Sequence, residues 1–248
     1  MILTIAYREF KTLFVSPLAW SILATVQFLL AYLFLGRMED FTKNQGKLAY
    51  LEYAPGLTEV VIIPLFHATA LIFLAVSPLL TMRLICEERR NKSLVLLLAA
   101  PISETQIVLG KYLAVIGFSS LIIMMISLMP LSLLSGGEID YGKLITNIIS
   151  VFLTMISCSA VGLYMSSIAN HIVMSALGSF SLLLFLLMLN WQTFSSHENI
   201  LAYLSLMSHL QVLQSGLLNT SDISYFMILT GIFLVLTIRR LTAERLGL

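Results

Sequence analysis

The sequence is poor in charge, in cysteine and in the residues that build metal sites. Lys, Arg, Asp and Glu make up 11% of the 248 residues, whereas a soluble domain has about 25%. The two cysteines, Cys86 and Cys158, have no metal-ligand spacing and form no disulfide framework. The net charge of +1 gives no basic field for nucleic acid. We therefore expect no metal site and no nucleic-acid partner.

The sequence also lacks the motifs of common enzymes. It contains neither a His-Glu-x-x-His zinc motif nor a Gly-x-Ser-x-Gly nucleophile motif. The segment GEIDYGKL, from Gly137, has the glycines and the lysine of a phosphate-binding loop. However, Leu144 occupies the position of the Ser or Thr that binds Mg²⁺. We predict that the chain is not an enzyme and binds no cofactor itself.

Apolar sequence is abundant instead, with 58% hydrophobic residues and a mean hydropathy of +0.95. A bilayer-spanning helix needs about 20 apolar residues, and six stretches approach or reach this length. They are Pro17–Leu35, Val60–Met82, the stretch between Lys111 and Glu138, the stretch after Lys143 to about Met165, Ile172–Phe194, and Tyr225–Ile238 with a start nearer Ser221. We predict an all-α polytopic membrane protein with one domain over residues 1–248.

The distribution of basic residues predicts the orientation. Six spans place both termini on one side, and that side carries ten of the 14 Lys and Arg residues. Five of the ten lie between the second and third spans, from Arg83 to Lys111. Because basic loops stay in the cytoplasm, we expect cytoplasmic termini. Residues 1–15, which place Ile5 and Phe14 opposite Arg8 and Lys11, are expected to form an interfacial helix.

The segment EERRNKSLVLLLAAPISETQIVLGK, from Glu87 to Lys111, is unusual. Four charged residues precede an apolar run from Leu94 to Ile102 that is too short to span a bilayer. A short amphipathic helix of this kind can enter a groove on a partner protein. It can equally lie on lipid headgroups.

This segment resembles the permease subunits of type-2 ABC transporters, close to the gliding-motility and nitrous-oxide-reductase maturation permeases. The similar residues are Glu87, Glu88 and Arg89 in a charged turn, Leu96, Leu97 and Leu98 in a triplet, and Pro101, Ser103, Ile107, Val108, Leu109, Gly110 and Lys111. REFKTLFVSPLA, from Arg8, and YLSLMSHLQVLQSGLLNTSDISYF, from Tyr203, are similar to two further blocks of the family. Lys92 and Ser93 depart from the usual Gly-Thr, and Val95 departs from Glu.

The resemblance implies a cytoplasmic coupling helix within residues 84–106 that docks on a separate ABC ATPase, which binds ATP and Mg²⁺. The expected coupling residues are Glu87, Glu88, Arg89, Arg90, Leu94, Leu96, Leu97, Leu98, Pro101 and Ser103. It also implies a bacterial inner membrane and a second permease copy, or a related chain, that pairs through the first and fifth spans.

The external residues 195–222 are apolar at helical spacing but are interrupted by polar residues, which favours two short helices that dip into the outer leaflet. In a permease they would gate the exit or dock an extracytoplasmic accessory protein. The expected gate residues are Tyr203, Ser205, Ser208, His209 and Gly216.

Three alternatives stay open from the sequence. The chain is an exporter permease, a non-transporting anchor of a gliding or pilus-type machinery, or an ion-coupled carrier. The carrier is disfavoured because the predicted spans contain no carboxylate. His67, Ser119 and Ser157 are candidates for a transport pathway, but His67 could equally bond a neighbouring helix, and Ser and Thr also hold membrane helices together.

Overall fold

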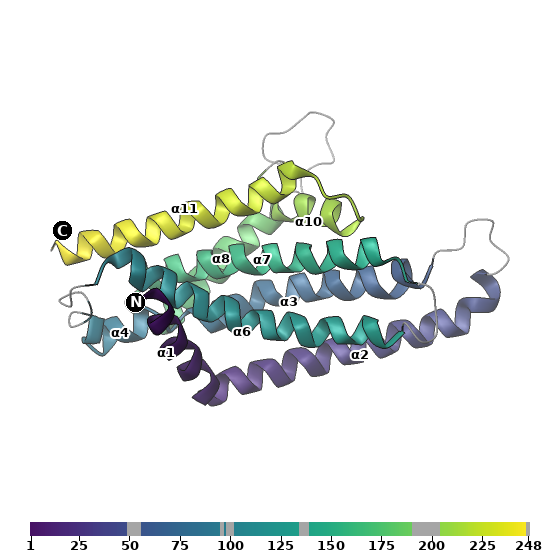
Figure 1. Ribbon diagram of the computed structural model, residues 1–248, viewed down its shortest axis with the longest axis horizontal. Helices are drawn as coiled ribbons and strands as arrows, with labels where there is room; N and C mark the ends of the chain where they lie inside the picture. Colours follow the sequence, from purple (N-terminus) through teal and green to yellow (C-terminus); the bar gives the residue numbers. More distant parts are fainter. Residues whose placement is uncertain (49–55, 95–96, 98–101, 134–138, 190–203, 247–248) are drawn as a thin grey trace.

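The protein is a bundle of long helices. The computed structural model describes residues 1–48, 56–94, 97, 102–133, 139–189 and 204–246, and none of these lies in a strand. Figure 1 shows the long helices side by side along one axis. In chain order the elements are α1 (Ile2–Val15), α2 (Pro17–Leu48), the π-helical turn η1 (Thr58–Ile62), α3 (Ile63–Thr81), α4 (Cys86–Arg90), α6 (Glu104–Ser132), α7 (Tyr141–Ile168), α8 (Ile172–Met188), α10 (Leu206–Gln214) and α11 (Thr220–Arg245).

Five helical stretches within the described residues are long and apolar enough to cross a membrane. They are Pro17–Asn44, Thr58–Arg90, Glu104–Ser132, Tyr141–Ile168 and Thr220–Arg245. The other predicted span corresponds to α8, whose 17 described helical residues are apolar but shorter. Its predicted continuation to Phe194 lies outside the described residues. An all-α, multi-pass membrane architecture is therefore confirmed, and the count of six depends on α8.

Two helices begin earlier than predicted. The predicted starts followed the charged residues Lys111 and Lys143, whereas in the structure capping residues set the starts. The third span was expected to begin after Lys111, but α6 begins at Glu104, where the Ser103 hydroxyl accepts a hydrogen bond from Gln106 N. The Asp140 carboxylate similarly accepts a hydrogen bond from Lys143 N at the start of α7. Lys111 therefore lies inside a helix.

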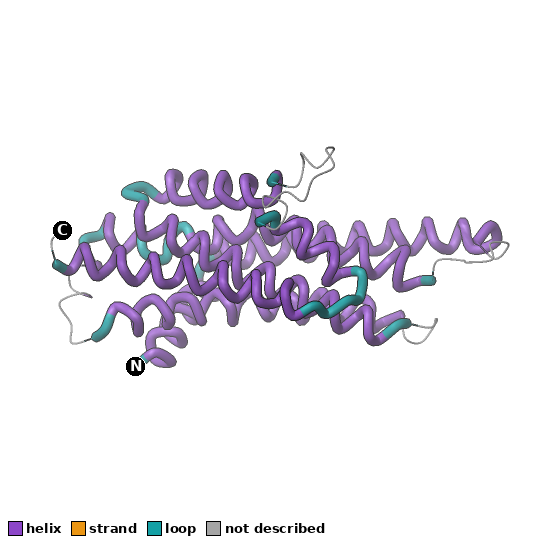
Figure 2. Tube along the Cα trace, turned by 90° about the horizontal axis from the view of Figure 1, so that it is seen from above, coloured by secondary structure: helices purple, strands orange, loops and turns teal. Residues whose placement is uncertain are grey.

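Both termini lie at one end of the bundle, and α4 lies at the same end (Figure 1). Figure 2 shows the bundle from above, with its long helices running in the same direction along its length. This arrangement agrees with an even number of spans. We call the end that holds α4 and both termini the α4 end. Its cytoplasmic location stays a prediction.

Helix α7 forms the centre of the bundle. It contacts α3, α6, α8, α10 and α11, and 72% of the residues in its most apolar stretch are buried, against 22% for α2 and for α11. Small residues permit this close packing: Gly162 lies directly against the Thr81 side chain of α3. The hydroxyl of Ser157 donates to Phe226 O of α11 at 3.1 Å.

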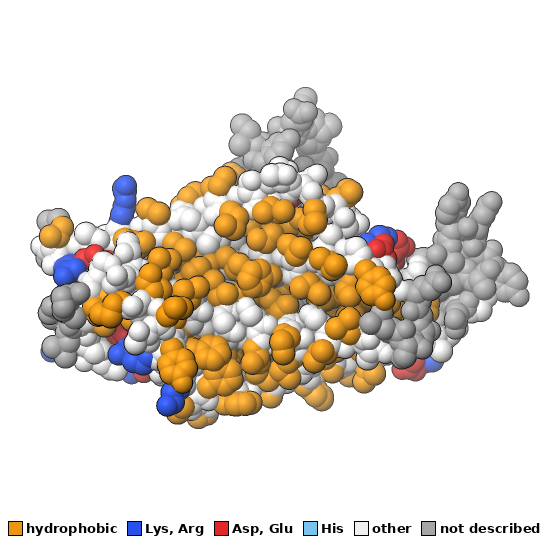
Figure 3. All heavy atoms as spheres, in the orientation of Figure 1, with side chains coloured by type: hydrophobic (Ala, Val, Ile, Leu, Met, Phe, Trp, Pro, Cys, Tyr) orange, Lys and Arg blue, Asp and Glu red, His pale blue; other side chains and the backbone are white. Residues whose placement is uncertain are grey.

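The outer surface between the two ends is apolar. Figure 3 shows hydrophobic side chains over the middle of one face, with most charged side chains towards the two ends. Helices α2 and α8 each expose large apolar side chains, and both contact α3. The exposed residues include Trp20, Phe28, Tyr32 and Leu35 of α2 and Val173, Leu177, Phe180 and Phe185 of α8. This surface suits contact with lipid or with another apolar helix.

Helix α1 confirms the helix predicted for residues 1–15 and packs against α6. Glycines of α6 allow the approach: a Cβ at Gly110 would lie 2.7 Å from Ile5 Cγ2, and one at Gly117 would lie 3.3 Å from the Phe10 ring. The Phe14 ring meets Phe118 with centroids 5.4 Å apart. Its position in the membrane interface stays a prediction.

Candidate functional site

The candidate site is the α4 end, where a short charged helix follows the α3 span. Helix α4 has five residues, so its backbone N–H groups depend on partners outside the helix. Ser166 of α7 supplies one: its hydroxyl oxygen accepts hydrogen bonds from Ile85 N and Cys86 N at 3.2 and 3.1 Å and donates to Met82 O. Ser166 and Cys86 are fully buried. Helix α4 is thereby fixed to the end of α7.

Arg89 fixes α4 to two further helix ends. Its Nε and Nη2 donate to the two carboxylate oxygens of Glu244 in α11, at 3.0 and 2.5 Å. Its Nη1 and Nη2 also donate to Ala169 O and Ser167 O at the C-terminus of α7. Carbonyls at a helix C-terminus lack partners within the helix and favour cations. The planar guanidinium therefore joins α4, α7 and α11 through one side chain.

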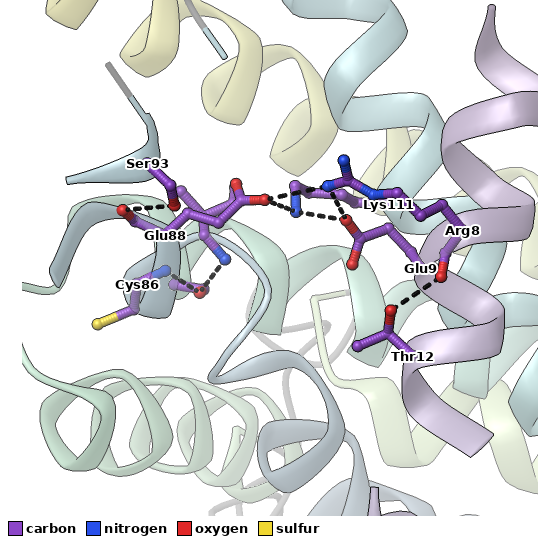
Figure 4. Close-up of polar contacts among 9 residues, drawn as sticks. Arg8, Glu9, Thr12, Cys86, Glu88, Ser93 and Lys111 are labelled. Atoms are coloured by element: carbon purple, nitrogen blue, oxygen red, sulfur yellow. Dashed lines mark hydrogen bonds and ion pairs between the residues drawn. The ribbon is translucent and has the colours of Figure 1, made fainter. Parts of the chain in front are cut away.

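A second charge cluster joins α4 to α1 and α6 (Figure 4). Lys111 of α6 is buried, and its Nζ lies 2.8 Å from Glu88 Oε1 of α4 and 3.2 Å from Glu9 Oε1 of α1. Arg8 lies 3.2 Å from Glu9 and 3.9 Å from Glu88. A buried ammonium is tolerated only with such paired carboxylates. The two cations and two anions of this cluster balance.

The C-terminus of α11 also contacts the start of α6. Arg245 Nη1 donates to Glu104 Oε1 at 2.8 Å. The Arg89–Glu244 and Arg245–Glu104 pairs together hold the last turn of α11 against the end of α4 and the start of α6.

The predicted coupling residues occupy different environments at the α4 end. Glu88 and Arg89 are engaged within the chain. Glu87 is half-buried and Arg90 is exposed, and neither side chain bonds a described residue. Leu94 is 2% exposed and belongs to the apolar core, with Leu97 partly buried against that core. Ser103 caps α6, whereas Leu96, Leu98 and Pro101 lie outside the described residues.

Lys92, one of the departures from the family pattern, has a left-handed backbone with φ = 58°. A Cβ is disfavoured in this region and glycine is not. The usual glycine at this position therefore suits the turn after α4. Ser93 assists the turn, because its hydroxyl donates to Glu88 O at 3.2 Å.

The opposite end contains the predicted gate segment, of which α10 and the start of α11 are described. Ser205 is buried at the start of α10, and Gly216 ends it with φ = 99°, a conformation that favours glycine. His209 Nδ1 lies 2.5 Å from Asp222 Oδ1, and its ring stacks on Tyr225. Ser208 is half-buried, and Tyr203 lies outside the described residues.

The pathway candidates lie on three different helices. His67 of α3 shares a 2.8 Å hydrogen bond with Gln214 Oε1 of α10, so it bonds a neighbouring helix, one of its two expected roles. Ser157 of α7 also contacts Thr230 of α11. Ser119 of α6 is buried. The His67 and Ser157 contacts are those of helix packing.

Several residues of the α4 end escaped the sequence analysis, namely Glu9, Ser166 and Glu244. Nothing in their local sequence marks them, because each acts on a partner far along the chain. At the other end, Asp222 lies in the first turn of α11 and is buried, which agrees with a sixth span that starts near Ser221. Lys111 differs from these residues, because a lysine seven positions after the start of a long apolar helix is visible in the local sequence. That position indicates a buried charge that needs a partner.

Comparison with known families agrees with the resemblance. A family model described as "ABC-2 family transporter protein" matches residues 3–245, nearly the whole chain. No curated protein matches the sequence.

Proposed function

The chain belongs to the ABC-2 transporter family, and from that premise we propose that it is the transmembrane permease subunit of an ATP-driven exporter. A separate ATPase would hydrolyse ATP and push on the α4 end from the cytoplasm. A second copy, or a related chain, would pack against the exposed faces of α2 and α8. The relationship to the gliding-motility and nitrous-oxide-reductase maturation permeases stays a prediction.

The polar contacts of α4 are the observation that carries this proposal. Through Ser166, Arg89 and Glu88, the short helix is joined to α7, α11, α1 and α6. A load on α4 therefore reaches α7, the central helix, and both ends of the described chain. Such a connection lets a small displacement at one site bias the arrangement of a helix bundle.

The half-buried Glu87 and the exposed residues that follow Arg89 supply a docking surface. Glu87 and Arg90 carry opposite charges, and Asn91 and Lys92 are exposed beside them. Charged groups at the rim of an interface fix register and select partners. We assign the docking contact to Glu87, Arg90 and the following turn. Glu88 and Arg89 instead hold α4 in place.

Co-expression with the ATPase encoded beside this chain tests the proposal. Deleting the 94–101 segment would remove Leu94 from the core, so charge reversal at Glu87 and Arg90, which bond no described residue, is the sharper change. Glu87→Lys with Arg90→Glu is expected to abolish co-purification of the ATPase and the ATP turnover that the permease stimulates. Arg37→Glu, an exposed charge reversal at the opposite end of α2, is the control and is expected to leave both unchanged. Full co-purification and turnover in the Glu87 and Arg90 variant would show that α4 is not the docking site.

A further inference from the structure

A pocket of about 440 Å³ opens beside α4, between α1, the first turn of α2, the end of α3 and the start of α6. Its lining combines leucines with six charged side chains. The charged residues are Arg8, Arg83, Lys111, Glu9, Glu87 and Glu88. This combination of charge and apolar surface is unusual for a site that binds a soluble ion.

The apolar part of the pocket joins the exposed apolar surface of the bundle. Leu13, Leu18 and Leu80 form part of the wall, and Leu79 and Val15 are 42% and 75% exposed. All five residues lie within a few positions of the ends of α1, α2 and α3. The pocket therefore sits where the apolar surface of the bundle meets its charged end, the depth at which a bilayer has its headgroups.

The pocket contains positively and negatively charged groups that make no hydrogen bond to the described part of the chain. Arg83 is exposed, and neither its guanidinium nor the Glu87 carboxylate bonds any described residue. Glu88 Oε2 is buried and accepts no hydrogen bond from the described part of the chain, although Oε1 contacts Lys111. Arg83 and Glu87 are four residues apart, and Glu87 N donates to Arg83 O, so both belong to one helical turn.

The three cations and three anions that line the pocket balance, so a ligand without net charge suits it best. A ligand with a net negative charge would satisfy Arg83 but would lie beside the carboxylates of Glu87 and Glu88. A ligand that carries one phosphate and one ammonium satisfies both sets. An N–H donor suits Glu87 and Glu88 better than a quaternary amine, because ionised carboxylates only accept hydrogen bonds.

We propose that this pocket binds one zwitterionic phospholipid of the bilayer whose headgroup ends in a primary ammonium, as in phosphatidylethanolamine. The phosphate lies against Arg83 and Arg8, the ammonium against Glu87 and Glu88, and an acyl chain along Leu79 and Leu18. Glu87 belongs both to this pocket and to the proposed docking surface, whereas Arg83 belongs to the pocket alone and Arg90 to the docking surface alone. Lipid binding is measured without an ATPase, so its test is separate from that of the proposed function.

Native mass spectrometry of the purified full-length chain tests the proposal. The delipidated protein is incubated separately with phosphatidylethanolamine, phosphatidylcholine and phosphatidylglycerol that carry identical acyl chains. We expect roughly tenfold more of the one-lipid complex with phosphatidylethanolamine than with either of the others, the effect of about one charge-assisted hydrogen bond. Glycerophosphoethanolamine, which has no acyl chains, is expected not to displace the lipid.

Two single variants and one matched control separate this site from general lipid adhesion. Arg83→Gln and Glu87→Gln remove groups without described partners, so the fold is expected to persist. Glu87→Gln is expected to abolish the tenfold preference, because it removes a carboxylate that accepts from the ammonium. Arg83→Gln is expected to weaken the binding of all three lipids, because each of them carries the phosphate that Arg83 contacts. Arg240→Gln removes an exposed arginine of α11 that does not line the pocket, and it is expected to retain the preference. Equal binding of the three lipids, preference for phosphatidylglycerol, displacement by glycerophosphoethanolamine, or an equal loss in Arg240→Gln would each overturn the proposal.

Discussion

Arg89 is the residue on which the α4 end most depends. It makes four hydrogen bonds to Glu244, Ser167 and Ala169, and no other cation in the described chain contacts all three. Its side chain is 16% exposed and that of Glu244 is 29% exposed. The contact is therefore partly shielded from water, and its loss leaves a carboxylate and two carbonyls without a donor.

We predict that Arg89→Ala lowers the free energy of unfolding by about 2–3 kcal/mol, since the lost hydrogen bonds involve charged groups. Arg89→Lys is expected to recover only part of this loss, because an ammonium cannot form the two-pronged contact with Glu244. Denaturant unfolding in detergent measures both. A double-mutant cycle with Glu244→Gln is the control, and additive effects would show that the two residues do not interact.

Lys92 gives the second prediction at this scale. Its left-handed backbone costs about 1 kcal/mol for a residue with a Cβ, so Lys92→Gly is expected to raise the unfolding temperature. Lys92→Ala removes the same charge but keeps the Cβ, and it is expected to give no increase. Equal unfolding temperatures for the Gly and Ala variants would mean that backbone strain is not the cause.

At the scale of the helix, the contact between α1 and α6 depends on glycine. A Cβ at Gly110 would lie 2.8 Å from Ile5 Cβ, an atom close to the backbone that cannot move aside cheaply. Gly110→Ala is therefore predicted to displace α1 and to destabilise the protein by about 1–3 kcal/mol. The pair Gly110→Ala with Ile5→Gly makes room for the methyl group. We expect it to be more stable than Gly110→Ala with Phe10→Ala, a truncation of α1 that leaves the clash in place.

Helix α10 is predicted to depend on His67. His67 bonds Gln214, and Asn147 Nδ2 donates to Gln214 O at 3.1 Å, so the end of α10 is held by α3 and α7. In His67→Phe, residues 206–214 are expected to exchange amide hydrogens faster, while α1 and α4 are unchanged. Hydrogen exchange measured by mass spectrometry checks this. Unchanged exchange in α10 would remove the structural role that we assign to His67.

The sequence predicts elements better than contacts, for a physical reason. Apolar stretches are local signals, so the start of the first span at Pro17 and the end of the fourth span at Ile168 are found to within a few residues. The Arg89–Glu244 pair joins residues 155 positions apart, and neither local sequence specifies the other. Lys111 is an example of both kinds of signal. Its charge suggests a loop, but the Ser103 cap starts the helix before it. The residue that neutralises it, Glu9, lies far away in the sequence.

At the scale of the whole molecule, the two ends differ in what they offer a partner. At the α4 end, Glu88 and Arg89 fix α4 to the bundle, whereas Glu87 and Arg90 bond no residue in the part of the chain that the structure describes. The opposite end holds α10 and the contact between the partly buried His209 and the buried Asp222. The apolar faces of α2 and α8 lie between them. This division suits a subunit that receives force at one end and changes its packing along its length.

Site-specific cross-linking to the co-expressed ATPase tests the central claim most directly. In a background with Cys86→Ala and Cys158→Ala, which removes both buried thiols, Asn91→Cys places a thiol on the exposed turn after α4. A reagent that joins this thiol to the ATPase is predicted to give a covalent permease–ATPase product and to stop ATP turnover. Arg37→Cys is predicted to give neither. A product from Arg37→Cys and none from Asn91→Cys would contradict the assignment of the α4 end as the coupling site.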